Sequence, residues 1–263
     1  YWIRVMNNKI KKILKKKNKS KIVCLTAYSK NIAEIIDDHA DIVLVGDSLG
    51  SVLYNYDTTR KVSLNMMIEH TKSARMGVKK SLLVIDLPYN TYRNKSEALK
   101  NSKKAIKETK CDAVKVEGGT RVKEIVKHLV KNKIPVLGHI GITPQTTKGK
   151  FRSKGKNEKE IRKLLKDARD LEQSGAFGMV LECIYSDISK QITSAINIPT
   201  IGIGASVNCD GQVLVTDDLI GLNETKFRFV KKFGNIKKDI KSAVIKYKNS
   251  VKQKKFPSKK NSY

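Results

Sequence analysis

The stretch Ile42–Asp47 (Ile-Val-Leu-Val-Gly-Asp) is a short apolar run that ends at an acidic side chain. A run this short and continuously apolar is typical of a strand buried on both faces of a parallel sheet. The pattern recurs at residues 22–26, 82–86, 113–117, 135–139, 179–182 and 198–204. With an eighth strand expected around Gln212–Thr216, the chain has the strands of a closed parallel barrel.

Between these runs, apolar residues recur at helical spacing. The pattern predicts helices at residues 30–39, 64–76, 95–109, 121–131, 157–174 and 186–196. Asn157 and Glu160 have the spacing of a capping box. Strands that alternate with helices in this way predict an α/β fold, a (β/α)8 TIM barrel. An open doubly wound sheet is the alternative, but Gly202-Ile203-Gly204 follows a late strand and lacks the dinucleotide-binding spacing.

The two ends of the chain differ from its centre in composition. We expect a basic N-terminal extension over residues 1–20, a single barrel domain over 21–250 and a basic tail over 251–263, which we predict to be disordered. Residues 9–17 predict an N-terminal helix with three apolar residues on one stripe. This helix is expected to dock on the barrel or on a neighbouring subunit, whereas binding to a membrane surface is disfavoured by so narrow an apolar face.

Charge is the most extreme feature of the 263-residue composition, with 54 Lys and Arg against 25 Asp and Glu and a net charge of +29. Basic chains can bind nucleic acids, but the lysines are spread along the whole sequence and no nucleic-acid-binding motif accompanies them. We therefore expect a solvated basic surface, with no specific nucleic-acid partner and no membrane partner. A basic nucleic-acid-binding protein remains the rival hypothesis from another class.

Several features predict a cytoplasmic location. No apolar run approaches the roughly 20 residues that span a bilayer. Residues 1–4 lack the pattern of a secretory signal, and Met6 is a candidate start. The four cysteines, none of which lies in a Cys-x-x-Cys pair, are expected to be reduced thiols. They are Cys24, Cys111, Cys183 and Cys209.

Polar side chains follow the strands, and the carboxyl ends of barrel strands share one face. The residues expected to converge there are Asp47, Asp86, Lys115, Glu117, His139 and Glu182. Lys115 faces the same way as Glu117, because residues two apart on a strand share a side. Clustered carboxylates repel unless a cation lies among them, and Mg²⁺ prefers oxygen ligands. The alternative is a ring of loop acids that are solvated or paired with lysines.

Seven segments together resemble the ketopantoate hydroxymethyltransferase (3-methyl-2-oxobutanoate hydroxymethyltransferase) family, in the family's order and at similar spacing between about Lys21 and Gly221. They are Thr26-Ala27-Tyr28, residues 45–50 (VGDSLG), 86–89 (DLPY), 114–119 (VKVEGG), 138–145 (GHIGITPQ), 181–183 (LEC) and 201–205 (IGIGA).

The resemblance implies an enzyme that transfers a hydroxymethyl group from 5,10-methylenetetrahydrofolate to 3-methyl-2-oxobutanoate. The product would be 2-dehydropantoate (ketopantoate), formed through a Mg²⁺-stabilised enolate on the way to pantothenate and coenzyme A. The resemblance also implies a homo-oligomer, commonly a decamer.

Residue roles carry over from the same resemblance. Asp47 and Asp86 would bind Mg²⁺, and Glu117 would bind it directly or through water. Together with Asp47 and Asp86, Ser48 and Lys115 would hold the keto acid. Glu182 would be the catalytic base. For His139, a hydrogen-bonding role behind these residues and a plain place at the barrel mouth both stay open.

The sequence also departs from the family's pattern. Ser29 and Ser206 replace the usual Asp and Gly, and the loop Thr146–Lys156 is shorter, with Gly-Lys-Phe-Arg at residues 149–152 in place of a glycine pair. These changes bear on folate binding rather than on the metal or the base. A second rival, the isocitrate lyase and phosphoenolpyruvate mutase group, usually carries a Lys-Lys-Cys-Gly-His type loop, which this sequence lacks.

Overall fold

The computed structural model describes residues 7–147, 152–224 and 227–263. The expectations for residues 1–4, Met6 and positions 149–151 fall outside these ranges. The chain divides into two compact units, Tyr1–Val215 and Thr216–Tyr263. The first unit contains the residues of the expected site.

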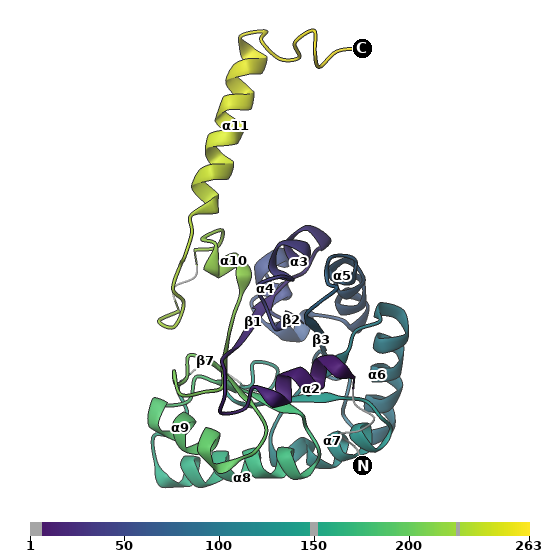
Figure 1. The fold of residues 1–263 in the computed structure, drawn as a ribbon, viewed down its shortest axis with the longest axis vertical. Helices are drawn as coiled ribbons and strands as arrows, with labels where there is room; N and C mark the ends of the chain where they lie inside the picture. Colours follow the sequence, from purple (N-terminus) through teal and green to yellow (C-terminus); the bar gives the residue numbers. More distant parts are fainter. Residues whose placement is uncertain (1–6, 148–151, 225–226) are drawn as a thin grey trace. The chain divides into compact units, whose positions relative to one another are not determined.

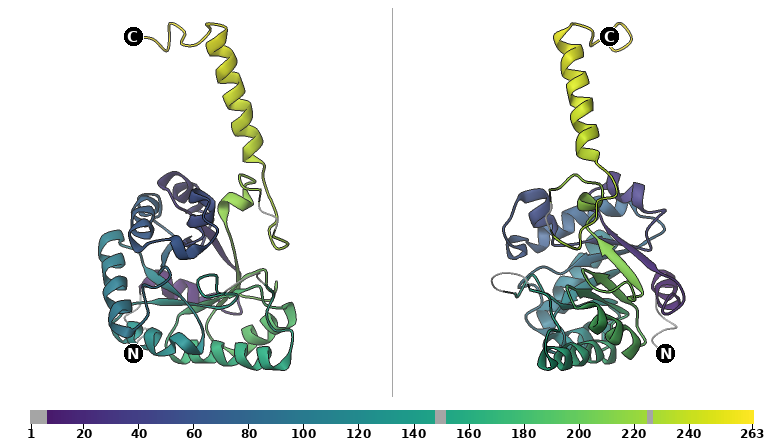
Figure 2. Two further views of the ribbon diagram at one scale, coloured as in Figure 1. Left: turned by 180° about the vertical axis from the view of Figure 1, so that it is seen from behind. Right: turned by 90° about the vertical axis from the view of Figure 1, so that its left-hand side faces the viewer.

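The first unit contains a closed barrel of eight parallel strands in sequence order, β1 to β8. The strands are β1 (Ile22–Thr26), β2 (Ile42–Val45), β3 (Leu82–Asp86), β4 (Ala113–Glu117), β5 (Val136–Gly141), β6 (Gly178–Glu182), β7 (Thr200–Ile203) and β8 (Gly211–Leu214). Figures 1 and 2 show helices around the outside of these strands. The prediction of a TIM barrel is confirmed.

Six outer helices confirm those predicted from periodicity. They are α3 (Lys30–Ile36), α5 (Leu64–Gly77), α6 (Lys95–Thr109), α7 (Lys123–Lys131), α8 (Glu158–Gln173) and α9 (Ser186–Ala195). Helix α3 ends three residues before the predicted end at 39. The side chain of Asn157 caps α8 by accepting from the backbone N–H of Glu160, and the Glu160 carboxylate turns back to accept from the N–H groups of Gly155 and Lys156.

In the first unit, three short helical segments were not predicted, because each is too brief to show a period. They are α4 (Leu49–Tyr54), η1 (Thr59–Lys61) and η2 (Thr120–Val122). Each follows the carboxyl end of β2 or β4, and so they belong to the loops at the mouth of the barrel. The local pattern of apolar residues therefore predicted the strands and outer helices of the barrel, but not the short helices in the loops at its mouth.

The opposite end of the barrel is covered by helix α2 (Asn8–Lys15). Ile10 and Ile13 are buried against residues that begin strands, among them Ile22, Ile42 and Leu82. This packing confirms the predicted helix and its docking on the barrel. Ile10 and Ile13 close the floor of the barrel, and the partly buried Leu14 packs against the same cluster.

Removing the Ile10 side chain is expected to destabilise the barrel. Ile10 is completely buried, so Ile10→Ala should lower the free energy of unfolding by about 2–5 kcal/mol, the usual cost of such a cavity. Ile35→Ala is the matched control, because Ile35 is 67% exposed. Urea denaturation followed by circular dichroism measures both, and equal, small effects would show that α2 contributes little to the core.

The second unit contains α10 (Thr216–Leu219) and α11 (Ile236–Lys252), followed by turns up to Tyr263. Helix α11 is capped by the Asn235 side chain, which accepts from the N–H of Lys238. The predicted disorder of the tail at 251–263 is not confirmed. The predicted domain limits at residues 20 and 250 stay predictions.

Two further expectations from the sequence concern the cysteine thiols and membrane-spanning segments. All four cysteines are free; Cys24, Cys111 and Cys209 are buried, and Cys183 is partly exposed. Among the described residues, no helix is both long and apolar enough to cross a membrane.

Candidate active site

The acidic side chains named from the sequence lie at one end of the barrel because of where their strands stop. Asp86, Glu117 and Glu182 are the last residues of β3, β4 and β6. Asp47 follows β2 by two residues, and His139 lies within β5 opposite Glu117 in the register. Parallel strands point the same way, so these side chains share the carboxyl-terminal mouth.

Asp86 and Lys115 form a buried ion pair at the centre of this group. The Lys115 Nζ lies 2.7 Å from Asp86 Oδ1, and the two side chains are only 5% and 3% exposed. Burial lowers the pKa of Lys115, but the surrounding carboxylates, Asp86 foremost, outweigh burial and raise it above its usual range. Lys115 is therefore a permanent positive charge at the floor of the mouth.

Asp47 lies beside this pair and is held by hydrogen bonds of its own. Its backbone N–H donates to Asp86 Oδ2 at 3.1 Å, and its Oδ2 accepts from Gln145 Nε2 at 2.9 Å. Burial, together with the charges of Glu117 and Asp86, raises the pKa of Asp47 well above its usual range. The raised pKa means that crowding by the other carboxylates favours the protonated form of Asp47, and a bound cation would favour its ionised form instead.

Glu117, His139 and Glu182 form a row across the mouth. His139 Nδ1 lies 3.3 Å from Glu117 Oε1, and its Nε2 lies 3.2 Å from Glu182 Oε2. Burial lowers the pKa of His139, but the Glu117 carboxylate outweighs burial and raises it to about 9. Burial raises the pKa of Glu117, and His139 outweighs this effect and lowers it.

The contacts of His139 are ion pairs by distance, although neither ring nitrogen meets the angular criteria of a hydrogen bond. Because its pKa is raised to about 9, the ring is positively charged at neutral pH, and the two carboxylates within 3.3 Å attract it electrostatically. His139 therefore links Glu117 to Glu182 and is not a plain residue of the barrel mouth.

Gly46 and Ser48, the two neighbours of Asp47 in the sequence, lie beside the same cluster of side chains. Ser48 precedes α4, and its Oγ lies 2.9 Å from the hydroxyl of Tyr28. A Cβ at Gly46 would lie 2.9 Å from Ser48 Oγ and 3.5 Å from Asp86 Oδ2, so a side chain there would displace the Ser48 hydroxyl. The bare backbone at Gly46 leaves the space next to Asp86 open.

Gln145 is a site residue for which the sequence predicted no role, although it ends the segment 138–145 that resembles the family. It lies in the turn after β5 and is only 1% exposed. Besides holding Asp47, it donates from its backbone N–H to Glu117 Oε2 at 3.2 Å. A glutamine directly after Thr-Pro in a loop carries no signal of such contacts, because its partners come from other strands.

The carboxylates fit a magnesium ion that is completed by water and substrate. Among the described residues, no three His, Cys, Asp or Glu side chains form a ready-made metal cage. Asp47 and Asp86 supply two neighbouring carboxylates, and Mg²⁺ is usually held by one or two carboxylates with waters and substrate oxygens. Carboxylate oxygens are the donors that this hard cation prefers.

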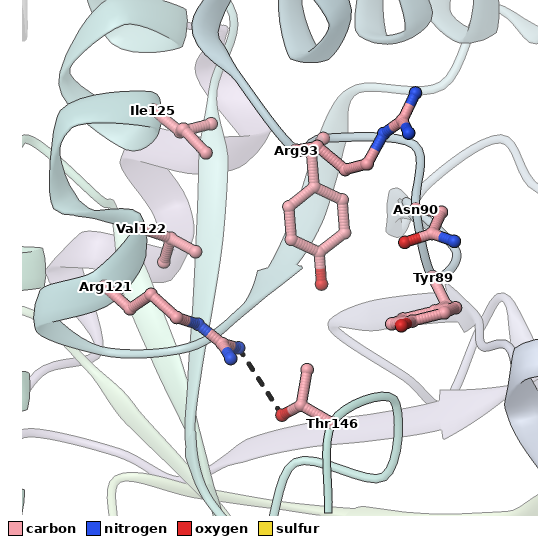
Figure 3. A pocket seen from close by; sticks show the side chains of 8 residues that line it. Tyr89, Asn90, Arg93, Arg121, Val122, Ile125 and Thr146 are labelled. Atoms are coloured by element: carbon pink, nitrogen blue, oxygen red, sulfur yellow. Dashed lines mark hydrogen bonds between the residues drawn. The ribbon is translucent and has the colours of Figure 1, made fainter.

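The loop Thr146–Lys156 is anchored at both of its described ends. Figure 3 shows a pocket in which Arg121 points toward Thr146, with a guanidinium N to Oγ1 distance of 3.4 Å. The pocket is lined by Tyr89, Asn90, Tyr92, Arg93, Arg121, Val122, Ile125 and Thr146. At the other end, the N–H of Lys154 donates to the carbonyl of Cys183 at 2.8 Å, one residue after Glu182.

The two serines that depart from the family's pattern have different surroundings. Ser206 is buried, and its Oγ accepts from the Ser186 hydroxyl at 3.0 Å and from the Asn208 N–H at 3.2 Å. Ser29 precedes α3 without a capping bond from its side chain. Ser206 thus ties the loop after β7 to α9, whereas nothing in the structure explains Ser29.

Comparison with solved structures shows the same fold in other enzymes. Phosphoenolpyruvate phosphomutase from Streptomyces platensis is 9% identical, with a TM-score of 0.62 over 94% of this chain and 87% of its own. A 2,3-dimethylmalate lyase of the phosphoenolpyruvate mutase and isocitrate lyase superfamily is 16% identical, with a TM-score of 0.54 over 74% of this chain and 71% of its own. At these identities the likeness extends to the fold alone.

Comparison by sequence is far closer. The 3-methyl-2-oxobutanoate hydroxymethyltransferase of Pelagibacter ubique is 61% identical over 98% of this chain and 100% of its own length. The enzyme of that name from Rhizobium etli is 48% identical over 90% of this chain and 88% of its own length. The sequence model of ketopantoate hydroxymethyltransferase matches residues 7–259. Such coverage decides against both rival hypotheses, and the chain belongs to the ketopantoate hydroxymethyltransferase family.

Proposed function

We propose that the chain converts 3-methyl-2-oxobutanoate to 2-dehydropantoate (ketopantoate), with 5,10-methylenetetrahydrofolate as one-carbon donor and Mg²⁺ as cofactor. The reaction is a step toward pantothenate and coenzyme A. The observation that carries the proposal is that the buried carboxyl groups of Asp47 and Asp86 lie beside Lys115 at one mouth of the barrel. A further carboxylate, Glu182, lies at the same mouth.

In this proposal, Asp47 and Asp86 hold the magnesium ion. Glu117 acts through a water molecule, since its Oε1 already contacts His139 and its Oε2 accepts from the N–H of Gln145. When bound, the ion supplies Lewis acidity that polarises the keto group and stabilises the negative charge that develops on its oxygen. The remaining steps belong to the side chains of the chain itself.

Lys115 and Ser48 orient the keto acid. The buried ammonium of Lys115 attracts the substrate's carboxylate, and its partner Asp86 keeps it in place at 2.7 Å. Ser48 has its hydroxyl fixed by Tyr28 at 2.9 Å, so the hydroxyl is presented without further loss of side-chain freedom. Both groups hold the substrate with its C3–H available to a base.

Glu182 is the base in this proposal because it is the accessible carboxylate of the row. Its side chain is 19% exposed, whereas those of Glu117 and His139 are 2% exposed. Glu182 removes the C3 proton, and C3 then forms a bond to the methylene carbon of the folate as one of that carbon's two C–N bonds breaks. Water displaces the second folate nitrogen from the same carbon, and the two released nitrogens take up the proton from C3 and one proton from the water. Water supplies the hydroxyl oxygen, so that one methylene, one water and the keto acid give ketopantoate and tetrahydrofolate.

A direct assay tests the whole proposal. Purified protein should form ketopantoate only when keto acid, methylenetetrahydrofolate and Mg²⁺ are all present, with product followed by mass spectrometry. Chelation of the metal should stop the reaction, and added Mg²⁺ should restore it. Product formed at the same rate with the chelator would contradict the metal's role, and no product under any condition would overturn the proposed function.

Changes in the loop Thr146–Lys156 should affect the transfer of the one-carbon unit from methylenetetrahydrofolate. Lys154→Pro removes the N–H that donates to Cys183, a bond worth about 1 kcal/mol, which corresponds to about a fivefold rise in KM for methylenetetrahydrofolate. Lys154→Ala keeps that N–H and is the matched control. In both variants, the rate at which the C3 hydrogen exchanges in deuterated water without folate should equal that of the parent. If exchange falls with transfer, the loop serves the base instead.

We further propose that the protein works in the cytoplasm as a homo-oligomer, a decamer by resemblance to its family. Its partners are the small-molecule substrates rather than a specific nucleic acid or a membrane. The support is the family relationship together with lysines that are spread along the chain. Sedimentation equilibrium of the purified protein measures the number of subunits directly.

A further inference from the structure

The side chain of Gln145 connects three elements at the mouth of the barrel. Its Nε2 donates to Asp47 Oδ2 at 2.9 Å and to the carbonyl oxygen of Leu87 at 3.0 Å. Its Oε1 accepts from the hydroxyl of Tyr92. Both amide hydrogens and the amide oxygen are therefore used, by Asp47 after β2 and by Leu87 and Tyr92 in the loop between β3 and α6.

Asp47 and Leu87 fix the orientation of the amide, whereas the hydroxyl of Tyr92 can donate or accept and so does not distinguish its two ends. Turned by 180°, the group would place Oε1 against the carboxylate of Asp47 and the carbonyl of Leu87, which are both acceptors. It would also place Nε2 against the hydroxyl of Tyr92. Two lost bonds and two repulsive contacts in a buried place make that arrangement unfavourable. The observed orientation consequently presents a donor to Asp47 and to no other carboxylate side chain.

The backbone of Gln145 is anchored as firmly as its side chain. Its N–H donates to Glu117 Oε2 at 3.2 Å, and its carbonyl accepts from Arg60 Nε at 2.9 Å. The turn itself is closed by the N–H of Thr146, which donates to the carbonyl of Thr143 at 2.9 Å. One buried residue thus holds Asp47 with its side chain and Glu117 with its backbone.

We infer that Gln145 is a positioning residue for the divalent cation, which fixes the orientation of the Asp47 carboxylate beside Asp86. The inference rests on the proposed function, in which Asp47 and Asp86 hold the metal. A hydrogen bond to Oδ2 restrains rotation of the carboxylate and keeps Oδ1 aimed in one direction. Residues that orient metal ligands in this way typically change metal affinity or activity 10- to 100-fold when they are replaced.

The contacts of Gln145 allow two roles: stabilising its own turn, or orienting the carboxylate of Asp47. If the residue only stabilises its turn, any loss of a contact should lower stability and leave cation affinity alone. If it orients Asp47, the bond from Nε2 matters for the cation, and the bond from Tyr92 to Oε1 matters much less. The two contacts can be removed one at a time, because they belong to different ends of the amide.

Cation binding can be measured without turnover, with Mn²⁺ alone as the probe and the free ion followed by electron paramagnetic resonance. Gln145→Met keeps the volume of the side chain and loses its polar contacts, so we expect the Kd for Mn²⁺ to rise about 10- to 100-fold. Tyr92→Phe keeps both Nε2 donors, and its Kd should stay within about threefold of the parent. Gln191→Met, at an exposed position on α9, should bind like the parent.

Turnover adds a second readout, since misplaced metal ligands should lower kcat more than they raise KM for methylenetetrahydrofolate. Should Gln145→Met not fold, as judged by thermal unfolding, Gln145→Asn replaces it, because an amide one methylene shorter cannot reach Asp47. Parent-like Mn²⁺ affinity in whichever variant folds overturns the inference. An equal loss of Mn²⁺ affinity in Tyr92→Phe also overturns the inference, because the affinity would then depend on the stability of the turn and not on the bond to Asp47. A parent protein that binds no Mn²⁺ overturns the metal step of the proposed function instead.

Discussion

Replacing Asp47 or Asp86 by alanine should abolish ketopantoate formation while the barrel stays folded. Each change removes a buried carboxylate from the pair that we propose to hold the metal. The loss should exceed the roughly 10- to 100-fold effect that is typical of residues behind the ligands. Initial rates at saturating Mg²⁺ and keto acid, together with Mn²⁺ affinity, measure the effect.

Stability is the necessary companion measurement, because residues at a barrel mouth serve function more than folding. Asp47→Ala should unfold at about the parent's temperature, since it relieves repulsion among carboxylates. Asp86→Ala leaves Lys115 without its 2.7 Å partner and should be the less stable of the two. Asp38→Ala, at an exposed position paired with Lys80, is the control for a lost acid. Near-normal turnover and metal affinity in either Asp47→Ala or Asp86→Ala would remove that residue from the proposed metal site.

The frame of the barrel was predictable because buried parallel strands carry a strong local signal. Runs such as Ile42–Val45 and Leu82–Ile85 are apolar on both sides, as a strand between a barrel core and outer helices must be. The eighth strand was located only approximately, since Gly211–Leu214 is short and its Gln212 is exposed. Helix α4 was missed because a six-residue segment hardly completes two turns.

The candidate site was predictable only as far as strand ends determine it. Asp86, Glu117 and Glu182 end their strands, so topology alone brings them to one mouth. The contacts of His139 with two of these carboxylates depend on side-chain directions across three strands, which a local pattern does not encode. The contacts of Gln145 were even less predictable, because its partners lie 28 to 98 residues away in sequence. Loops that meet only in the folded chain leave no periodic trace.

Glu182→Gln should separate the proton-transfer role from binding. The amide keeps the size of the side chain and loses its basicity, so the rate should fall about 10²- to 10⁴-fold, the usual contribution of a general base. With Mg²⁺ and 3-methyl-2-oxobutanoate in deuterated water, and without folate, the parent should exchange the C3 hydrogen for deuterium. Nuclear magnetic resonance of the keto acid follows this exchange.

The comparison of two rates identifies the base, because exchange needs only the metal, the bound keto acid and the group that removes the proton. In Glu182→Gln, exchange and ketopantoate formation should fall by the same factor, and Mn²⁺ affinity should stay near that of the parent. Glu172→Gln on α8 is a control for the same chemical change outside the mouth of the barrel. If Glu182→Gln exchanges deuterium as fast as the parent while transfer is lost, the base is another residue and Glu182 acts only after the proton has left.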